Sequence, residues 1–312
     1  MNSLVVHEPG QLTTVQDLGR DGFGPLGVSS SGAADALSLR LGNRLVGNPE
    51  NAAALEMTLV GGAFSFAHDA VIALSGSDFA ATLDGAPLAN WESHRIPAGA
   101  SLRLAAARTG ARCYLCVQGG IGVPLFLGSA STHLLSGLGG LQGRSLRRGD
   151  TLAIGDEAGA FCKRRVAPSV LSELLPRKTL RVTAGPQADW FSESARRALY
   201  ENSWRVAGTS NRMGLRLEGA GIETTPREMI TEGVALGAIQ APPSGEPILL
   251  FVEQQTTGGY PKIANVISAD LHSVGQLRPR DAIRFELVDF ATATTLLREQ
   301  ERLLQSDAVT SA

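Results

Sequence analysis

The sequence predicts a mainly β protein in which short strands form barrels or sandwiches, accompanied by a few short helices. Short runs of alternating polar and apolar residues recur along the chain, and turn residues separate them. Glycine makes up 36 of the 312 residues, well above the usual ~7%, which favours many turns and close backbone approaches. Hydrophobic residues make up 43% and charged residues 19%, so the chain can bury a core.

The alternating runs place the expected strands. A period of two, typical of half-buried strands, occurs at residues 55–59, 101–104, 179–182 and 215–218. Residues 80–88 contain the dipeptide Asp84–Gly85, which favours a two-residue hairpin turn. Strands and turns at this density are typical of barrels and sandwiches.

Three segments are expected to be helical. In residues 32–46, alanine and leucine recur every fourth residue between Ser31, an expected N-cap, and Gly47, an expected stop. Residues 187–200 carry acidic residues early and arginines late, which suits the helix dipole. Residues 291–305 form the third helix, followed by a polar tail that we expect to fray.

The chain length suggests two domains. We expect an N-terminal β-rich domain over residues 1–165, a C-terminal β-rich domain over 178–290, and a helix with its tail over 291–312. A linker is expected near 156–178, because this stretch combines a basic run with two prolines and few strand signals.

Charge and hydropathy exclude several classes of partner. The formal net charge is −2 and the pI is about 6.2, so nothing in the composition favours nucleic acid or an anionic membrane. The first residues lack a basic and an apolar signal region, and the apolar runs are too short to span a bilayer. We therefore expect a cytoplasmic protein.

The usual metal and nucleotide motifs are missing. Cys113 and Cys116 form a C-x-x-C pair, but on a strand their side chains point to opposite faces, and no second ligand pair follows. The histidines are scattered, so no metal site is expected. There is no P-loop and no G-x-S-x-G, and the glycine run 137–143 has the wrong spacing for a dinucleotide site.

The stretch 14–32 joins glycines, Asp17, Arg20 and three serines in front of a predicted helix. Backbone N–H groups in such a loop can form a nest for an anion. An ordinary loop that caps the helix is the equal alternative.

The stretch 253–262 (EQQTTGGYPK) is the leading candidate for a site, with a polar turn that ends in a solvated lysine as the alternative. It follows the apolar run ILLFV and places amides, hydroxyls and two glycines before Lys262, one of three lysines in the chain. Glycine permits close backbone approach to a ligand, and an ammonium group can neutralise a developing negative charge. The candidates in this stretch are Gln255 and Lys262 for catalysis, and Thr256, Thr257, Gly258 and Gly259 for substrate binding.

Further candidates lie outside that stretch. Arg212, with Asn211 beside it, offers a planar fork for a substrate carboxylate, although a surface ion pair is the commoner role for an arginine. Glu232 and Gln240 flank an apolar segment and are candidates for catalysis and for substrate binding, respectively. The predicted first helix adds Asp35 and Arg40 as substrate-binding candidates, with exposed helix positions as their alternative.

Several long segments, in the same order, resemble the family of the C subunit of 5-oxoprolinase, also known as the Kip-antagonist-like or allophanate hydrolase subunit 2 family of biotin-dependent carboxyltransferase domains. The resemblance spans about residues 3–290. Its segments are TTVQDLGRDGFGPLGVSSSGAADALSLRLGNRLVGNPENAAALEMTL, GPQADWF, SNRMGLRLEG, TEGVALGAIQAPPSGEPILL, QQTTGGYPKIANVISADL and GQLRPRDAIRFE.

The resemblance implies two cyclophilin-like β-barrel domains. It also implies ATP-dependent opening of the 5-oxoproline lactam to glutamate, in a complex with a Kip-inhibitor-like B subunit and a third subunit. A lactam is a stable amide that ATP can activate, so the protein mainly needs to position groups and neutralise charge.

Two other functions fit the same resemblance. One is a carboxyltransferase or allophanate hydrolase-type subunit acting on urea or another amide; biotin would then arrive on another chain, because no lysine here lies in a biotin-acceptor motif. The other is a non-catalytic module that antagonises a Kip inhibitor by binding it.

Overall fold

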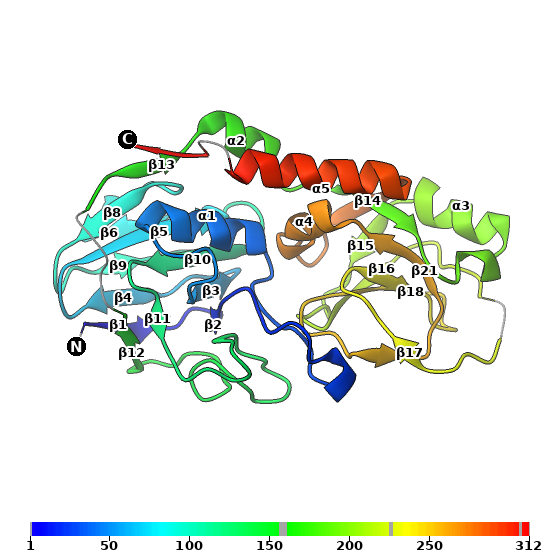
Figure 1. Cartoon of the computed structure of the whole chain (residues 1–312), viewed down its shortest axis with the longest axis horizontal. Helices are drawn as coiled ribbons and strands as arrows, with labels where there is room; N and C mark the ends of the chain where they lie inside the picture. The colour runs from blue at the N-terminus through cyan, green and yellow to red at the C-terminus, as the bar shows by residue number, and fades with distance from the viewer. Residues whose placement is uncertain (1, 156–160, 225–226, 306–307, 312) are drawn as a thin grey trace. The chain divides into compact units, whose positions relative to one another are not determined.

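The computed structural model describes residues 2–155, 161–224, 227–305 and 308–311. The chain divides into two compact units. Unit 1 comprises Met1–Arg20, Ser31–Leu174 and Leu303–Ala312, and unit 2 comprises Asp21–Ser30 and Leu175–Arg302. Both units consist mainly of β-strands (Figure 1), which confirms the predicted fold class.

Most described strands of unit 1 belong to two sheets. The first has the order β11-β12-β1-β4-β9-β6-β7 and the second the order β2-β3-β10-β5-β8. Their bounds are β1 (Ser3–Glu8), β2 (Leu12–Gln16), β3 (Ala54–Thr58), β4 (Ala63–Phe66), β5 (Ala70–Gly76), β6 (Thr82–Leu83), β7 (Ala86–Pro87), β8 (Ser93–Ile96), β9 (Leu102–Arg103), β10 (Arg112–Val117), β11 (Ile121–Gly122) and β12 (Thr151–Ile154). The hairpin expected at Asp84–Gly85 is confirmed, since β6 pairs with β7 across it.

One apolar core is shared by the two sheets of unit 1. It includes Val6 from β1 and Leu115 from β10, both fully buried. The helix α1 (Ala36–Val46) packs against the other face of the second sheet, where Cys116 joins its apolar residues. Cys113 lies in the core between the sheets, so the two thiols point to opposite faces of β10, as the strand prediction requires.

The helix α1 begins later than the sequence predicts. Its N-cap is Asp35, whose carboxylate accepts hydrogen bonds from the backbone and the hydroxyl of Ser38 at 2.9 and 2.6 Å. Ser31, the expected N-cap, instead donates to the Thr132 carbonyl at 2.8 Å. Gly32 has a φ of +97°, which lies outside the helical region, so the helix cannot extend back to it.

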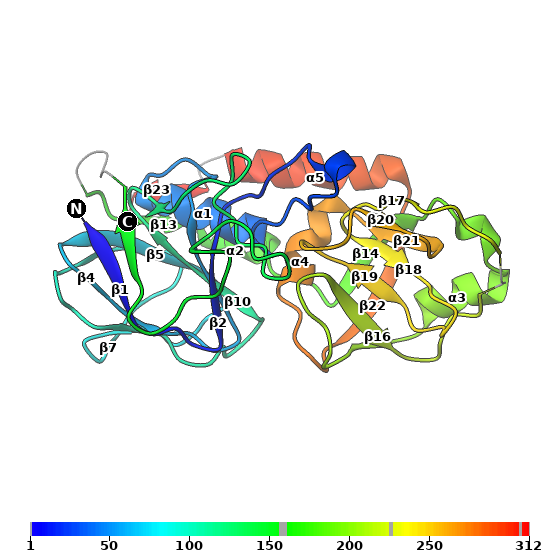
Figure 2. The ribbon, with the colours of Figure 1, turned by 90° about the horizontal axis from the view of Figure 1, so that it is seen from below.

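Part of the expected linker belongs to unit 1. It contains β13 (Arg164–Val166) and α2 (Pro168–Glu173), whereas residues 156–160 lie outside the described part of the chain. The tail expected to fray forms β23 (Val309–Ser311), which pairs with β13 (Figure 2). Val166 and Ala308 are buried in the cluster beneath α1, and this burial orders both segments.

Unit 2 forms a closed barrel with the strand order β14-β21-β18-β19-β16-β15-β22. The strands are β14 (Thr179–Ala184), β15 (Trp204–Val206), β16 (Gly214–Glu218), β18 (Ala238–Gln240), β19 (Ile248–Leu250), β21 (Lys262–Val266) and β22 (Ala282–Leu287). A separate pair, β17 (Glu232–Gly233) with β20 (Thr257–Gly258), joins two loops of this unit. The barrel places the leading candidate stretch 253–262 between β19 and β21.

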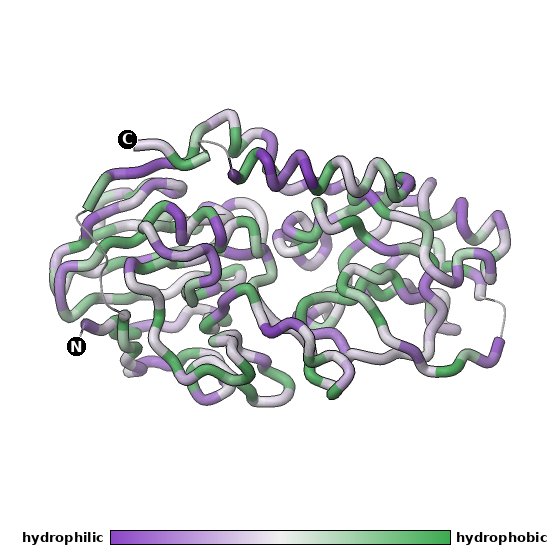
Figure 3. Tube along the Cα trace, in the orientation of Figure 1, coloured by the Kyte–Doolittle hydropathy of each residue, from purple (hydrophilic) through white to green (hydrophobic). Residues whose placement is uncertain are grey.

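The helical elements of unit 2 are short, except for the last one. They are η1 (Gly24–Leu26), η2 (Ala188–Trp190), α3 (Glu193–Glu201), η3 (Ser268–Asp270), α4 (Leu271–Gly275) and α5 (Phe290–Gln305). The helix expected over 187–200 is therefore interrupted: Phe191 is extended, and Ser192 caps α3 by accepting from Ala195 N. The third expected helix is confirmed as α5, whose C-terminal half is hydrophilic (Figure 3) and whose residues from Leu303 onward belong to unit 1.

Among the described residues, no helix combines the length and the apolar composition needed to cross a bilayer.

Candidate functional site

The site centres on Lys262, the first residue of β21. The residue is 3% exposed, and its ammonium group forms an ion pair with Glu232 of β17. β21 lies beside β18 in the barrel, and a β-bulge between Ile239 and Gln240 places Gln240 opposite Lys262. Directly opposite residues of antiparallel strands share one face of the sheet, and bulges commonly redirect side chains at functional sites.

Gln187 joins both members of the ion pair. Its Nε2 donates to Oε1 of Glu232 at 2.9 Å, and its Oε1 accepts from the backbone N–H of Lys262 at 3.1 Å. The turn that carries Gln187 lies close to β21 because Gly185 has no side chain. A Cβ at Gly185 would lie 2.2 Å from the carbonyl oxygen of Lys262. Glu232 Oε1 therefore accepts hydrogen bonds from two buried residues of the barrel end.

Gln240 contributes a donor that is not used by the described residues. The residue is 1% exposed, its Oε1 accepts from Gln255 Nε2 at 3.4 Å, and its Nε2 has no partner among the residues that the structure describes. Gly258 lies against this amide, since a Cβ there would be 2.5 Å from Nε2. Gly258 is also the strand partner of Glu232. A buried polar group without a partner is costly, so such a group points to a ligand.

The electrostatics of the site favour an ionised carboxylate. The Lys262 ammonium, followed by the Gln187 amide, lowers the pKa of Glu232 below the usual value for glutamate. The Glu232 side chain is 44% exposed, whereas the Lys262 side chain is 4% exposed. The positive charge of Lys262, on a barrel strand, is therefore buried, whereas the negative charge of Glu232 is partly exposed to solvent.

The remaining candidates of the stretch 253–262 line the outer side of the same region. Gln255, Thr257 and Gly259 are exposed, and Thr256 is half-buried. The Thr256 carbonyl accepts from Val234 N, which extends the pairing of β17 with β20. The structure brings together five of the candidates, Lys262, Glu232, Gln240, Gln255 and Gly258, and their role toward a ligand stays a prediction.

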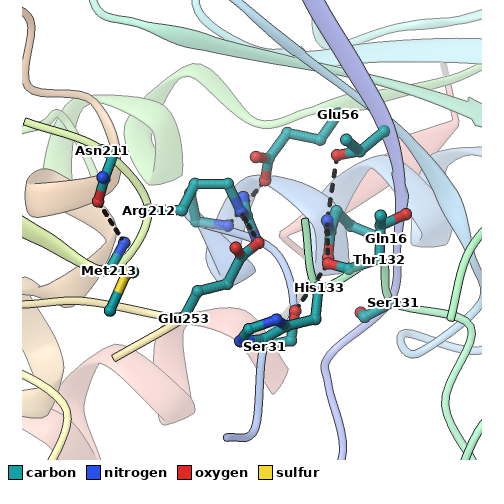
Figure 4. A network of polar contacts seen from close by, with 12 residues as sticks. Gln16, Ser31, Glu56, Ser131, Thr132, His133, Asn211, Arg212, Met213 and Glu253 are labelled. Atoms are coloured by element: carbon teal, nitrogen blue, oxygen red, sulfur yellow. Dashed lines mark hydrogen bonds and ion pairs between the residues drawn. The ribbon is translucent and has the colours of Figure 1, made fainter. Parts of the chain in front are cut away.

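Asn211 and Arg212 lie on a turn before β16 in unit 2. Arg212 Nε donates to Glu253 Oε1 at 2.5 Å, and both side chains are at most 5% exposed (Figure 4). Asn211 Oδ1 accepts from Met213 N at 2.8 Å and thereby closes the turn. Arg212 thus has a carboxylate partner within its own unit, and its binding of a substrate carboxylate stays a prediction.

Asp35 and Arg40 belong to unit 1. Asp35 caps α1 and is 2% exposed, and Arg40 pairs with Glu50 at 2.6 Å. The Asp35 N–H donates to the hydroxyl of Tyr114, which in turn donates to Glu56. Both candidates therefore take part in interactions that stabilise α1, and their role toward a ligand stays a prediction.

The loop expected to form an anion nest contains its own anion. The carboxylate of Asp17 accepts from the backbone of Gly19 and Ala130 and from the hydroxyls of Ser129 and Ser131, at 2.5–2.8 Å. A second set of bonds in unit 1 joins Gln16 Nε2 and the Ser31 hydroxyl to the carbonyl of Thr132 (Figure 4).

The thiols of β10 are unsuited to nucleophilic or metal chemistry. Burial raises the pKa of the Cys116 thiol to about 12, and it raises the pKa of the Cys113 thiol as well. Within the described ranges, no cluster of three or more histidine, cysteine or acidic residues is arranged to hold a metal ion.

The family described as "Carboxyltransferase domain, subdomain A and B" matches residues 26–287. The chain belongs to this carboxyltransferase domain family. It is 39% identical to the C subunit of 5-oxoprolinase from Haemophilus influenzae, over 92% of each chain. It is also 39% identical to the C subunit of 5-oxoprolinase from Escherichia coli, over 97% of this chain and 96% of the other. The resemblance found in the sequence segments is thus confirmed.

Solved carboxyltransferase structures share the fold. The crystal structure of the Kluyveromyces lactis urea carboxylase matches 96% of this chain with a TM-score of 0.85 and 34% identity. This chain covers only 28% of that protein, so the similarity concerns one part of a much larger enzyme.

Sequence reasoning missed Gln187 and the pairing of Glu253 with Arg212. Gly185 and Pro186, which precede Gln187, indicate a turn after a strand. Nothing in the local pattern shows that this turn meets β21, because that contact depends on the closure of the barrel.

Proposed function

We propose that this chain is the C subunit of an ATP-dependent 5-oxoprolinase, which works with partner subunits in the cytoplasm to open 5-oxoproline to glutamate. The similarity to two bacterial C subunits, which runs along nearly the whole length of both chains, carries this proposal. The partners implied by the resemblance are a Kip-inhibitor-like B subunit and a third subunit, and the interface should bury at least ~1,200 Å² in total.

The chemistry requires activation of a stable amide. Phosphorylation of the lactam oxygen by ATP makes the ring carbon a better electrophile for water. Water then adds to this carbon, the C–N bond breaks as the nitrogen takes a proton, and a second water releases phosphate from the acyl phosphate. Negative charge develops on oxygen in these steps, and a buried ammonium group stabilises such charge.

In this proposal the barrel end of unit 2 supplies the stabilising groups. Lys262 neutralises the developing charge, Glu232 is the resident counter-ion of the ammonium group, and Gln255 orients the reacting group. The other proposed substrate contacts are Gln240, Thr256, Thr257, Gly258, Gly259, Asn211 and Arg212, with Asp35 and Arg40 as further candidates from unit 1. The unpartnered amide of Gln240 beside the ion pair, seen among the described residues, supports a ligand at this place.

The test is to reconstitute the chain with its partner subunits and to measure ATP hydrolysis with 5-oxoproline, urea and related lactams. We expect turnover of 5-oxoproline only when all subunits and ATP are present. Full activity of the isolated chain, or tight association with the partners without any turnover, would contradict the proposal. The second of these results would indicate a non-catalytic antagonist of a Kip-type inhibitor.

A carboxyltransferase acting on urea or another amide is the second candidate. The similarity to the urea carboxylase structure favours it. In that reaction the carboxyl group comes from carboxybiotin on another chain. Carboxybiotin consumption in the presence of urea, with no response to 5-oxoproline, would favour this function over the first.

A further inference from the structure

The oxygen Oε1 of Glu232 lies in a site built by other residues. It accepts from the ammonium group of Lys262 and from the amide Nε2 of Gln187, and both residues are more than nine-tenths buried. Two donors that converge on one oxygen are a common arrangement for binding a carboxylate or a phosphoryl oxygen. Here that oxygen belongs to the protein itself.

The donors and the acceptor differ in how firmly they are held. Lys262 starts a barrel strand, and Gln187 is bound to the same strand through the N–H of Lys262. Glu232 lies on β17, a two-residue strand that pairs only with the equally short β20 among the described strands, and both of its residues are exposed. The exposed carboxylate can therefore move into water when another anion replaces it, whereas the buried ammonium group stays in place.

The region also has a third donor on the same side. Gln240 lies opposite Lys262, and its Nε2, unpartnered among the described residues, lies against Gly258, the strand partner of Glu232. Lys262 and Gln187 both bind Oε1 of Glu232, and the Gln240 amide is bonded to neither oxygen of that carboxylate among the described residues. A ligand with two or more acceptor oxygens can bind all three donors at once.

We infer that Glu232 is a displaceable counter-ion, and that its Oε1 marks the position of an anionic oxygen of the ligand, which replaces it on Lys262 and Gln187. The ligand class is a small oxyanion, either a carboxylate or a phosphoryl group. This inference deepens the proposed function and rests on it only for the name of the carboxylate ligand.

The cost of leaving the Lys262 ammonium group without a counter-ion favours direct exchange of Glu232 for the ligand anion. Removing the only carboxylate from a buried ammonium group leaves an uncompensated charge, which is strongly destabilising. Glu232 therefore stays on Lys262 in most molecules until another anion takes its place. The Glu232 carboxylate competes with the ligand for Lys262. The apparent affinity of the ligand is therefore its intrinsic affinity multiplied by the fraction of molecules in which the site is open.

The experiment is isothermal titration calorimetry of the full chain with three probes. These are inorganic phosphate, 5-oxoproline, and 2-pyrrolidinone, which is the same lactam without the carboxylate. The variants are Glu232→Gln, Glu232→Ala as a second removal of the charge, and Lys262→Met. Glu228→Gln is the matched control, since Glu228 is an exposed glutamate on the same segment.

We expect Glu232→Gln and Glu232→Ala to bind at least one anionic probe about tenfold more tightly than the wild type, as for a site that is open about a tenth of the time. Binding of 2-pyrrolidinone should not change, the control should match the wild type, and Lys262→Met should lose the anion. A gain confined to 5-oxoproline identifies a carboxylate as the ligand group, and a gain confined to phosphate identifies a phosphoryl group.

Unchanged or weaker binding of both anions in both Glu232 variants would overturn the inference, as would an equal gain for 2-pyrrolidinone. The outcome is independent of turnover. If the reconstituted complex fails to open 5-oxoproline while Glu232→Gln still tightens phosphate binding, the proposed function fails and the oxyanion site stands.

Discussion

The Asp17 network of unit 1 and the Lys262 cluster of unit 2 are both built on a charged side chain with little exposure. Around Asp17 the hydrogen bonds close within the protein: both carboxylate oxygens accept from backbone N–H groups or serine hydroxyls. Around Lys262 they do not close, because the counter-ion is exposed and the Gln240 amide has no partner among the described residues.

This difference indicates that the Asp17 network stabilises the fold, whereas the Lys262 cluster is suited to binding a ligand. A fully satisfied buried network holds two chain segments in one arrangement and offers nothing to a ligand. A cluster with an unused buried donor has capacity left for a binding partner. The sequence of the stretch 14–32 cannot reveal which case applies. Gly19 lies within it, but Ser129, Ala130 and Ser131, which also bind Asp17, lie more than a hundred residues further on.

Substitution of Lys262 should have the largest effect of the changes considered, and the effect should be on turnover. Lys262→Ala removes the buried ammonium group, and we expect the ATP-dependent turnover of the reconstituted complex to fall by about 10²–10³. Lys178→Ala is the matched control, because Lys178 pairs with Asp281 at the surface. Turnover of Lys262→Ala within about twofold of the wild type, with folding and assembly of the complex intact, would remove Lys262 from the reaction.

The Asp17 network should respond in stability instead. Asp17→Asn turns one acceptor oxygen into a donor, so the backbone N–H of Gly19 or Ala130 faces another N–H group. We expect a loss of about 2–4 kcal/mol in the free energy of unfolding, measured by urea denaturation. Asp69→Asn, at an exposed surface pair, should leave the midpoint near that of the wild type. An equally small shift for Asp17→Asn would show that the network is not structural.

Gly258→Ala tests the open amide with a smaller change. The new Cβ would lie 2.5 Å from Gln240 Nε2, so the amide must move away from its position. We expect the anionic probe, phosphate or 5-oxoproline, to bind about tenfold more weakly in calorimetry, because roughly one hydrogen bond to the ligand is lost. Gly233→Ala, on the paired strand, meets nothing within 4 Å and serves as the control. Equal affinities for the two variants would count against a binding role for Gln240.

The smallest effect should be the pH dependence of the ion pair between Glu232 and Lys262. Because the pKa of Glu232 is lower in the folded chain than its usual value of 4.5, the ion pair stabilises the fold above that pH and is lost as the pH falls through the lowered value. We expect NMR titration of the Glu232 carboxyl carbon to show this low pKa. In Gln187→Ala the pKa should rise, because a donor to the carboxylate is gone. An identical titration curve in the two proteins would show that Gln187 does not position Glu232.

Local patterns predict the elements of this fold well. The alternation at 179–182 and 215–218 corresponds to β14 and β16, and the C-x-x-C pair lies on a strand as expected. The predicted start of α1 is wrong because two capping residues, Ser31 and Asp35, precede the same apolar repeat. The backbone angles of Gly32 and Asp35, which depend on the packing of the loop, decide between them.

The site is predictable where its residues are neighbours in the sequence. The stretch 253–262 shows its glycines and its lysine directly, but the link to Gln187 spans 75 residues. The bulge that aligns Gln240 with Lys262 has no local signature either, since Ile263 reads as an ordinary strand residue. Long-range contacts of this kind arise when the barrel closes.

The return of the chain to unit 1 has a consequence for biosynthesis. Leu304 and Ala308 complete the apolar cluster that contains the buried residues of α1, and β23 pairs with β13. These C-terminal residues are synthesised after all of unit 2. At about 5–20 residues per second, the ribosome needs on the order of 10 s to add the 130 or so intervening residues. During that time the part of α2 and β13 that Leu304 and Ala308 cover stays exposed. A nascent chain stalled within unit 2 should therefore be held by chaperones through unit 1, although the first sheets of that unit have long been complete.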